Sequence, residues 1–384
     1  MKLKELGTIV TGNTPSKQSV ENWDSPDIGF VKPDIISDTG ISIIDDAAEY
    51  ISEKARAKAR IVGENSILIT CIGSIGKIGI TAKGTFAFNQ QINAIIPNRK
   101  VNSKYLAYAL LYAKPRLVAI ANAPVVPIIN KSQFGDFEIK VTENTEYQSK
   151  AVEVLDTVNA IIENRRQQLQ KLDELVKARF VEMFGDPVTN PMDWPTKPLL
   201  EMGYCKNGMN FHTGDSGIEM HCLGVGDFKD YSVIDGTDYL PTISLNEAPP
   251  EESMLQDGDL VFVRSNGNKA LVGRCLLVYP HNTPTTYSGF CIRYRLTSAE
   301  VNIAYLLRVL KTDSMRKKMA GRGANIQNLN QQILAALNIP TPPLELQEWF
   351  TAFIEQIDKS KVAVQKSLDE AQLLFDSLMQ QYFG

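Results

Sequence analysis

Two long stretches of the chain, 146–184 and 345–383, repeat apolar residues at every seventh position. In the first stretch, the two rows are Leu155, Ile162, Leu169, Val176 and Met183, and Ala151, Val158, Arg165, Leu172 and Arg179. In the second stretch, they are Ile354, Lys361, Leu368, Phe375 and Tyr382, and Ile357, Val364, Ala371 and Leu378. Paired rows with this period form the a/d seam of a coiled coil. Each stretch therefore predicts one helix, about 58 Å long at 1.5 Å per residue.

Three basic residues, Arg165, Arg179 and Lys361, interrupt these rows. A simple dimeric zipper keeps its seam apolar, whereas a polar residue in the seam specifies register. We therefore expect the two helices to pack antiparallel against each other in one defined register. The alternative is a pair of unrelated core helices.

Short strands are predicted in the region that precedes each long helix. In the first region, 66–72 and 91–96 are β-rich runs bounded by Gly, Asn and Pro, and an amphipathic helix is predicted over 103–117. The second region repeats this order, with strands at 259–263 and 290–296. A helix near 301–320 follows them. A run of prolines between 187 and 198 marks the passage from the first long helix into the second region.

The same sequence signals return in both regions. Val-Asn-x-x-Tyr-Leu stands at 101–106 and again at 301–306, and 129–134 is matched by 329–334. Near the start of each region, Gly7 and Gly12 correspond to Gly203 and Gly208. A period of about 200 residues is too long for a solenoid unit and indicates two whole domains in tandem.

The chain is therefore predicted to be an α+β protein of two tandem globular domains, each followed by a long helix. The segments are 1–144 and 189–344 for the domains, and 145–188 and 345–384 for the helices. The two helices would pack as an antiparallel coiled coil, and the molecule would have a pseudo-two-fold axis. Such an object suits a partner that is itself nearly two-fold, of which duplex DNA is the commonest.

Composition is that of an ordinary soluble protein. Of the 384 residues, 43% are hydrophobic and 22% are charged. We find neither an 18-residue apolar run nor a secretory signal at the N-terminus. The five cysteines are scattered, as expected of reduced thiols, so a cytoplasmic protein is predicted. The formal net charge is −4, but the acidic residues gather in the helical segments, so the charge neither proves nor excludes a DNA-binding surface.

Two polar loops occupy matching places in the two regions. The loop at 73–79 has glycines at every third position, but it lacks the first Gly and the Ser or Thr of a phosphate-binding P-loop. We interpret it as a tight turn between strands, with Ser74 and Lys77 pointing outwards. The matching loop, 264–269, is polar and partly basic. Two equivalent polar loops favour a surface that faces a ligand.

A further candidate surface lies at 311–328, where a basic helix end runs into a Gly-rich loop with amide side chains. Lys and Arg suit contacts to phosphates, while Arg, Asn and Gln can read base edges. The alternative is a solvated helix end followed by a flexible loop.

The sequence lacks the motifs of the enzyme classes that could act on DNA or on esters. Asp27, Glu138 and Lys140 could be imagined as a nuclease triad, but the repeat aligns 136–140 with 336–340, a predicted strand without an acidic residue. The Gly-x-Ser-x-Gly motif of hydrolases and the Asn-Pro-Pro-aromatic motif of amino-methyltransferases are both absent from the sequence. Cys205, His212, His221 and Cys222 lack the spacing of zinc ligands. We therefore expect a protein that is not an enzyme and holds neither a cofactor nor a metal.

Several motifs together resemble the specificity (S) subunits of type I restriction–modification systems. They are Gly-Asn-Thr-Pro-Ser-Lys at 12–17, Gly-Phe-Val-Lys-Pro-Asp-Ile at 29–35, Gly-Ser-Ile-Gly-Lys at 73–77, Phe-Asn-Gln-Gln-Ile-Asn-Ala at 88–94, and 337–347 with its Pro-Pro pair. The resemblance covers essentially the whole chain, including the order domain–helix–domain–helix. The sequence departs from the pattern at 141–145, where the first half lacks Pro-Pro, and the second half lacks the Thr-Pro-Ser-Lys turn.

This resemblance implies a subunit without catalytic activity. Each globular domain would be a target recognition domain for one half of a bipartite sequence in double-stranded DNA, and the paired helices would act as a ruler for the spacer. Two methyltransferase (M) subunits and restriction (R) subunits would be its partners.

The two halves differ in the loops that would contact DNA, which implies two different half-sites. Residues 13–17 stand opposite 207–212, and 89–91 stand opposite 287–288. The residues predicted to contact DNA are Asn13, Thr14, Ser16, Lys17, Ser74, Lys77, Asn89, Gln90, Asn207, His212, Arg264, Asn266, Lys269, Tyr287, Arg322, Asn325 and Gln327.

Two alternative functions compete with this interpretation. A protein-only scaffold would use the repeats and helices to bind proteins, and its polar loops would bind nothing. A cryptic endonuclease would cut DNA as an isolated chain in the presence of Mg²⁺.

Overall fold

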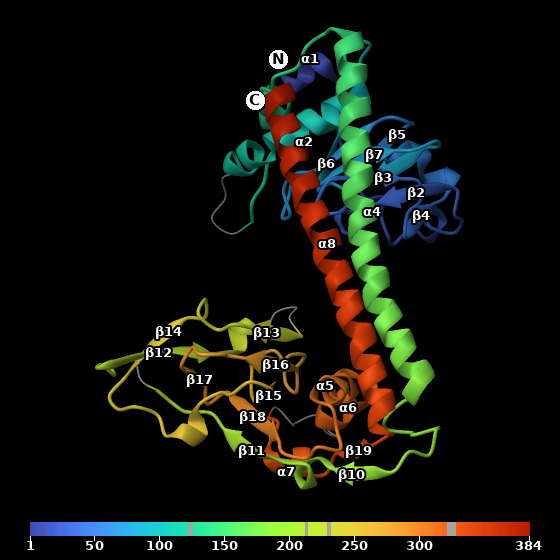
Figure 1. Cartoon of the computed structure of the whole chain (residues 1–384). Coiled ribbons are helices and arrows are strands. Elements are labelled where there is room, and N and C mark those ends of the chain that lie inside the picture. The colour runs from blue at the N-terminus through green and yellow to red at the C-terminus, as the bar shows by residue number, and fades with distance from the viewer. Residues whose placement is uncertain (122–125, 212–213, 229–231, 321–327) are drawn as a thin grey trace. The chain divides into compact units, whose positions relative to one another are not determined.

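The computed structural model describes residues 1–121, 126–211, 214–228, 232–320 and 328–384. The chain forms two compact units (Figure 1). The first unit comprises Met1–Gln167 together with Val364–Gly384, and the second comprises Gln168–Ala363. Each of the two long helices thus contributes one part to each unit.

The first unit contains a five-stranded sheet and a four-stranded sheet. The five-stranded sheet has the order β1 (Gly7–Thr11), β9 (Ile92–Pro97), β6 (Ile67–Thr70), β7 (Ile78–Thr81) and β3 (Ile41–Ile44). The smaller sheet has the order β4 (Glu49–Ile51), β2 (Ile28–Val31), β8 (Phe86–Phe88) and β5 (Ile61–Val62). The helices before the long one are α1 (Leu3–Leu6), α2 (Ser103–Ala119) and α3 (Lys131–Asp136). Pairing is antiparallel except between β3 and β7 and between β2 and β8.

The second unit repeats this arrangement. Its larger sheet has the order β11 (Gly203–Asn207), β18 (Cys291–Leu296), β15 (Asp259–Val263), β16 (Cys275–Tyr279) and β13 (Val233–Asp235). Its smaller sheets are β14 (Thr242–Leu245), β12 (Ile218–Leu223) and β17 (Thr285–Tyr287), and the pair β10 (Thr196–Pro198) and β19 (Asn338–Pro340). The helices are α5 (Ile303–Lys311), α6 (Asp313–Ala320) and α7 (Gln331–Ala335). The parallel pairs, β13 with β16 and β12 with β17, fall at the equivalent places. The internal repeat predicted from the sequence is therefore confirmed by the strand order of the larger sheets, while β5 of the first unit has no counterpart in the second unit's three-stranded sheet.

The repeated glycines mark close approaches of two backbones. A Cβ atom on Gly12 would lie 2.1 Å from the carbonyl oxygen of Asn89, and one on Gly208 would lie 2.0 Å from that of Ser288. No side chain fits at such a distance, so both repeats need glycine at this position.

The repeated asparagines are helix N-caps. Asn102 accepts hydrogen bonds from the amides of Lys104 and Tyr105, and Asn302 accepts them from the equivalent amides at the start of α5. Asn130 and Asn330 cap α3 and α7 in the same way. Capping satisfies amides that have no partner within the helix, so these sequence repeats fix where the equivalent helices begin.

The predicted helix near 301–320 is two helices, because the chain breaks at Thr312. This residue is extended, with φ −64° and ψ 148°, and its hydroxyl donates to the carbonyl of Val309 at 2.8 Å. A Thr side chain can offer the backbone such an alternative to the helical hydrogen bond. The prediction of one continuous helix is therefore wrong at this residue.

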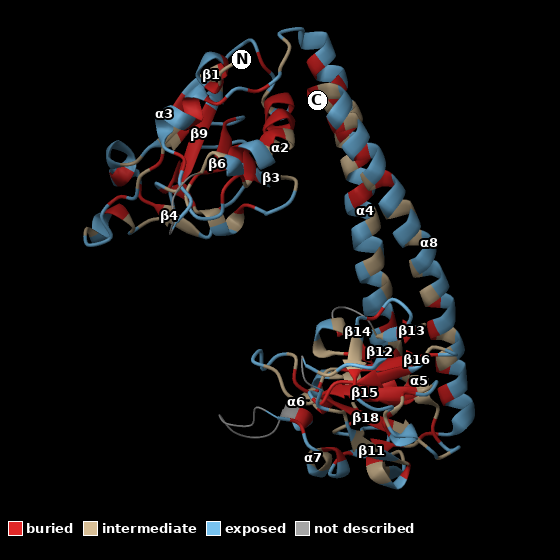
Figure 2. Cartoon of the chain, turned by 90° about the vertical axis from the view of Figure 1, so that its left-hand side faces the viewer, coloured by how far each residue is buried: buried red, intermediate tan, exposed pale blue. Residues whose placement is uncertain are grey.

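The long helices are α4 (Thr145–Phe184) and α8 (Leu344–Phe383), which begin and end within one residue of the predicted stretches. All residues of the predicted heptad rows are buried or half-buried (Figure 2). In the first unit, Leu155 and Ile162 of α4 share one core with Phe375 of α8. In the second, Val176 and Ile354 do so.

A buried glutamine anchors the first turn of each long helix. Gln148 accepts a hydrogen bond from the amide of Asn102 at 2.7 Å and donates to the carbonyls of Lys100 and Thr142. Gln347 makes the same three bonds, with the amide of Asn302 and the carbonyls of Glu300 and Pro342. Each long helix is thereby tied to the loop that precedes α2 or α5. Among the described residues, none of the helices is both long and apolar enough to cross a membrane.

Candidate DNA-recognition surface

The two polar loops predicted from the sequence occupy equivalent positions, one between β6 and β7 and the other between β15 and β16. The amide of Cys71 donates to the carbonyl of Gln91 at 2.7 Å, and the amide of Arg264 donates to that of Phe290 at 2.8 Å. The carbonyls of Cys71 and Arg264 accept in turn from the amides that precede α3 and α7, at 2.8 and 2.7 Å. Each loop is therefore held by the same two segments of its unit.

In the first unit, the structure joins two of the predicted loops. The hydroxyl of Thr14 donates to the side-chain oxygen of Gln90 at 2.8 Å, and both residues are exposed. Their neighbours support them from below. Asn13 bridges the amide of Arg60 and the carbonyl of Lys58, both at 2.7 Å. The buried Asn89 donates to Gln91 at 2.8 Å. The exposed pair can face a ligand, while Asn13 and Asn89 hold the loops in shape.

The turn at Ser16 and Lys17 is exposed and rests on an aromatic side chain. The carbonyl of Ser16 accepts from the indole of Trp23 at 3.2 Å, and the ammonium of Lys17 lies 5.2 Å from the centre of that ring. Lys17 also lies 3.4 Å from Glu49. Hydrogen bonding from Lys32 lowers the pKa of Glu49, so this carboxylate remains charged. The surface at the turn therefore carries a positive charge, on Lys17, and a negative charge, on Glu49.

Ser74 is exposed as predicted, but the prediction that Lys77 points outwards is wrong. The Lys77 side chain is only 13% exposed, and its ammonium lies 3.2 Å from Asp38. The turn at 73–76 reverses the chain so that Lys77 returns toward the sheet, where its amide donates to the hydroxyl of Thr70.

In the second unit, Asn207 and Lys269 are exposed, whereas Arg264 and Asn266 are half-buried. Asn207 accepts from the side chain of Gln331 at 3.3 Å. Arg264 donates to the carbonyl of Gly289 at 3.3 Å, and Asn266 accepts from the amide of Asn268 at 2.8 Å. Arg264 thus combines a positive charge with a hydrogen bond to the backbone of its own unit.

Tyr287 requires a correction. Its side chain is fully buried, and its hydroxyl donates to the carbonyl of Lys206 at 3.3 Å. Because the ring belongs to the core between the two sheets of the unit, it offers no surface to a ligand in this fold. The predicted residues His212, Arg322, Asn325 and Gln327 lie outside the described residues.

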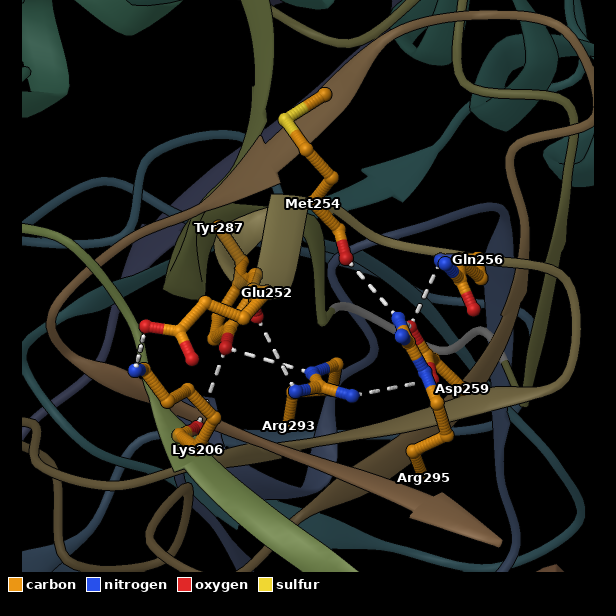
Figure 3. A network of polar contacts seen from close by, with 8 residues as sticks. All are labelled: Lys206, Glu252, Met254, Gln256, Asp259, Tyr287, Arg293 and Arg295. Atoms are coloured by element: carbon orange, nitrogen blue, oxygen red, sulfur yellow. Dashed lines mark hydrogen bonds and ion pairs between the residues drawn. The ribbon is translucent and has the colours of Figure 1, made fainter. Parts of the chain in front are cut away.

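The second unit also contains a buried ionic network that the sequence pattern did not predict (Figure 3). Arg295 forms a bidentate pair with Asp259, with both contacts at 2.8 Å. Arg293 is fully buried and lies 3.8 Å from the same carboxylate. The two arginines also donate to the carbonyls of Glu252 and Met254, so the network ties that loop to the sheet.

A signal for this network was present in the sequence. Arg293 and Arg295 stand two apart in a predicted strand, so both face the same side of the sheet. The paired strands β11 and β18 match β1 and β9, which puts Ala94 and Ile96 at the corresponding places in the first unit. The network is therefore present in the second unit and not at the corresponding positions of the first, so it distinguishes two domains that share one scaffold.

The described residues contain no group of three or more His, Cys, Asp or Glu side chains placed to hold a metal ion. Burial raises the pKa of the cysteine thiols, to about 11 for Cys275 and to about 12 for the other four. A thiol with such a pKa is protonated at neutral pH and is a poor nucleophile.

Two α+β units whose larger sheets have one strand order, each with a polar loop at the same place in its sheet and each joined to a 40-residue helix, define a tandem-repeat α+β protein. The sequence profile of one family, the type I restriction modification DNA specificity domain, matches residues 1–174 and 248–371, which is more than half of the chain. The chain belongs to this family.

Related specificity subunits of type I restriction enzymes match parts of the chain. The MjaIX subunit of Methanocaldococcus jannaschii is 29% identical over 229 residues, which cover 54% of this chain and 52% of that subunit. The StySPI subunit of Salmonella potsdam is 22% identical over 346 residues, covering 84% of this chain and 73% of its own length. The chain thus spans about half the length of the first of these relatives and about three quarters of the second.

Two solved structures share the fold. One is the S subunit of a type I restriction–modification system from M. genitalium, with a TM-score of 0.56 and 15% identity, covering 100% of this chain and 95% of that one. The other comes from a study of complex assembly and conformational transition in such a system, with a TM-score of 0.59, 15% identity, and coverage of 100% and 96%. At this identity the likeness concerns the fold.

Proposed function

We propose that this chain is the DNA-specificity subunit of a type I restriction–modification system, which recognises a bipartite DNA target and leaves methyl transfer and cleavage to other subunits. The duplication is the observation that carries the proposal. The larger sheets of both units have one strand order, yet the polar residues of the loops differ, with the exposed Thr14 and Gln90 in the first unit and the exposed Asn207 and half-buried Arg264 in the second. A common scaffold with different contact residues suits two different half-sites.

In this proposal, residues 1–144 and 189–344 are the two target recognition domains, and 145–188 and 345–384 are the helical spacers. The α4 and α8 helices pack as an antiparallel coiled coil and set the distance between half-sites. The burial of both heptad rows supports this packing. So do two polar contacts between the helices, one in each unit. Arg165 donates to Ser367 at 3.1 Å, and Lys361 pairs with Asp173.

The partners in the proposal are two methyltransferase subunits and the restriction subunits. Apolar side chains on α8 outside the heptad rows support a protein partner for this helix. In the first unit, Leu373 is 70% exposed and the adjacent Leu374 is 51% exposed. Exposed apolar groups of this kind mark interaction surfaces when they cluster. The complex would act on DNA in the cytoplasm.

The proposal is tested with the chain reconstituted with methyltransferase subunits. Arg264→Ala should relax one half-site, at a cost of ~1–3 kcal/mol per lost base contact, and Gln90→Ala should affect the other. Methylated sites mapped across a genome give the readout. If either variant changed both half-sites equally, two independent recognition domains would be ruled out.

The alternative functions give different results in the same system. With a recognition subunit, the complex binds DNA, and the logarithm of its association constant falls linearly with the logarithm of the salt concentration. With a protein-only scaffold, the complex gains no DNA binding from this chain. A cryptic endonuclease would cut DNA as the purified chain with Mg²⁺. Methyl transfer from S-adenosylmethionine by the purified chain alone would also contradict the proposal.

A further inference from the structure

A cavity of about 320 Å³ lies in the second unit, between the C-terminal end of α4 and the junction of α5 with α6. Its apolar lining comes mainly from α4 and the residues just after it, and consists of Val176, Phe180, Val181 and Pro187. The opposite wall carries two cations, Arg308 and Lys311. Cavities of this size that combine an apolar lining with a few polar groups are typical of small-molecule sites.

Arg308 is a half-buried cation whose donors are not used within the described part of the chain, where it makes no hydrogen bond or ion pair. The negative charges of Asp358 and Asp173 attract this guanidinium. Both carboxylates, however, lie within ion-pair distance of Lys361. Burial lowers the pKa of the Arg308 guanidinium, which reports the cost of holding this charge away from water.

Lys311 adds a second charge on the same wall. Its ammonium donates to the hydroxyl of Ser232 at 2.6 Å, which leaves two of its three donors. Burial lowers its pKa, and repulsion from Arg308, Arg274 and Arg316 lowers it further. An anion in the cavity would relieve this repulsion.

The acidic residues of the lining do not neutralise this wall. Asp186 accepts hydrogen bonds from the amides of Val188 and Thr189, at 2.9 and 3.1 Å. Asp313 is exposed at the first position of α6, where the helix dipole favours a negative charge. Asp186 is thus held by backbone amides, and Asp313 lies at a helix N-terminus.

The first repeat fills the equivalent place with aromatic rings. Through the repeated Val-Asn-x-x-Tyr-Leu motif, Tyr108 corresponds to Arg308 and Tyr112 corresponds to Thr312. The ring of Tyr108 lies 6.1 Å from that of Phe375, and Tyr112 lies 6.3 Å from Phe383 and bonds to Gln380. The second repeat therefore has a cavity wall with a cation at the position where the first repeat packs the Tyr108 ring against α8.

We propose that this cavity binds a small organic acid. Its carboxylate would pair with Arg308 and Lys311, and its apolar body would lie against Phe180 and Val176. A guanidinium and a carboxylate form charge-assisted hydrogen bonds with defined geometry. The residues that line the cavity include none of those predicted to contact DNA, so the proposed acid site and the proposed recognition of DNA can be tested separately.

Calorimetry on the full chain tests the proposal with naphthalene-2-carboxylate as the probe and its neutral amide as the matched control. The carboxylate should bind at least about tenfold more tightly than the amide, a difference of ~1.4 kcal/mol. Arg308→Gln should remove this preference, while Lys177→Gln, which changes an exposed charge at the rim, should preserve it. Thr312→Tyr, which copies the first repeat, should abolish binding of both probes.

Several outcomes would overturn the proposal. They are equal affinity for the two probes, a carboxylate preference that survives Arg308→Gln, and undetectable binding of the carboxylate at millimolar concentration. Circular dichroism establishes that each variant is folded, and Thr312→Tyr provides a second route if Arg308→Gln is unstable. Loss of binding when methyltransferase subunits are added would assign the cavity to a partner chain instead of a free acid.

Discussion

At the scale of single residues, the repeat is most sharply defined where two backbones meet. Gly12 and Gly208 each leave about 2 Å for a Cβ atom before it meets a carbonyl oxygen. Such positions tolerate no side chain. The requirement for glycine is the same in both halves, although the polar residues of the halves differ.

We therefore predict that Gly12→Ala and Gly208→Ala each destabilise the chain by ~1–3 kcal/mol or more, because the added methyl group forces the strands apart. Gly63→Ala is the control, since a Cβ atom there has no neighbour within 4 Å, and its effect should stay within about 0.5 kcal/mol. Urea-induced unfolding measures all three. Wild-type stability of Gly208→Ala would show that β11 can move away from Ser288.

A second prediction at this scale concerns His281, which lies 2.7 Å from Asp235 and 3.4 Å from Asp257. The hydrogen bond to Asp235, followed by the two negative charges, raises the pKa of His281 above its ordinary 6.5. A pKa raised by folding means that the stabilisation is complete below the unfolded pKa. It is lost as the pH rises through the folded value.

The stability difference between the wild type and His281→Asn should therefore shrink as the pH rises above 6.5. Asn tolerates the positive φ of 53° at this position, so the substitution removes the charge without adding backbone strain. NMR titration of the imidazole gives the pKa directly. A measured value below 6.5 would contradict the prediction.

At the scale of elements, the ionic network decides how the second unit differs from the first. Asp259 at the start of β15 pairs with Arg295 and Arg293 on β18, and both arginines hold the loop that contains Glu252 and Met254. The carboxylate is 1% exposed, so its pairing takes place away from water.

We expect Asp259→Asn to destabilise the second unit by about 3–5 kcal/mol, because it leaves buried guanidinium groups without a counter-charge. Glu252→Gln removes an exposed ion pair with Lys206 and should cost less than about 1 kcal/mol. Thermal unfolding with hydrogen exchange as a probe separates the two units. Equal effects of the two substitutions would mean that the network contributes little.

At the scale of the whole molecule, the proposed coiled coil makes the length of the helices a functional quantity. One heptad inserted after Leu169 lengthens α4 by ~10 Å and keeps the seam in phase. At 3.4 Å per base pair this corresponds to ~3 base pairs, which also rotates the second half-site by about a third of a turn.

Matched heptad insertions in α4 and α8 should therefore lengthen the spacer of the preferred site or abolish binding through misfacing. A four-residue insertion breaks the seam and should instead reduce stability and assembly with methyltransferase subunits. Mapping of methylated sites and size-exclusion chromatography give the two readouts. Unchanged activity together with an unchanged spacer after matched heptad insertions would exclude the helices as the ruler.

The sequence by itself determined the features that depend on neighbouring residues. The seven-residue rows located α4 and α8 to within one residue, because helix periodicity is a local property. The repeated asparagines and glycines established the duplication, because caps and tight backbone approaches each need particular residue types.

Only the tertiary structure decided which polar residues remain available to a ligand. Lys77 turns to Asp38, 39 positions earlier, Tyr287 enters the core, and Thr14 meets Gln90 across 76 residues. Such pairings depend on strand register and on how two sheets pack, which join segments far apart in the chain. The burial of Arg293 beside Asp259 follows from the same cause, because β15 and β18 become neighbours only when the sheet is assembled.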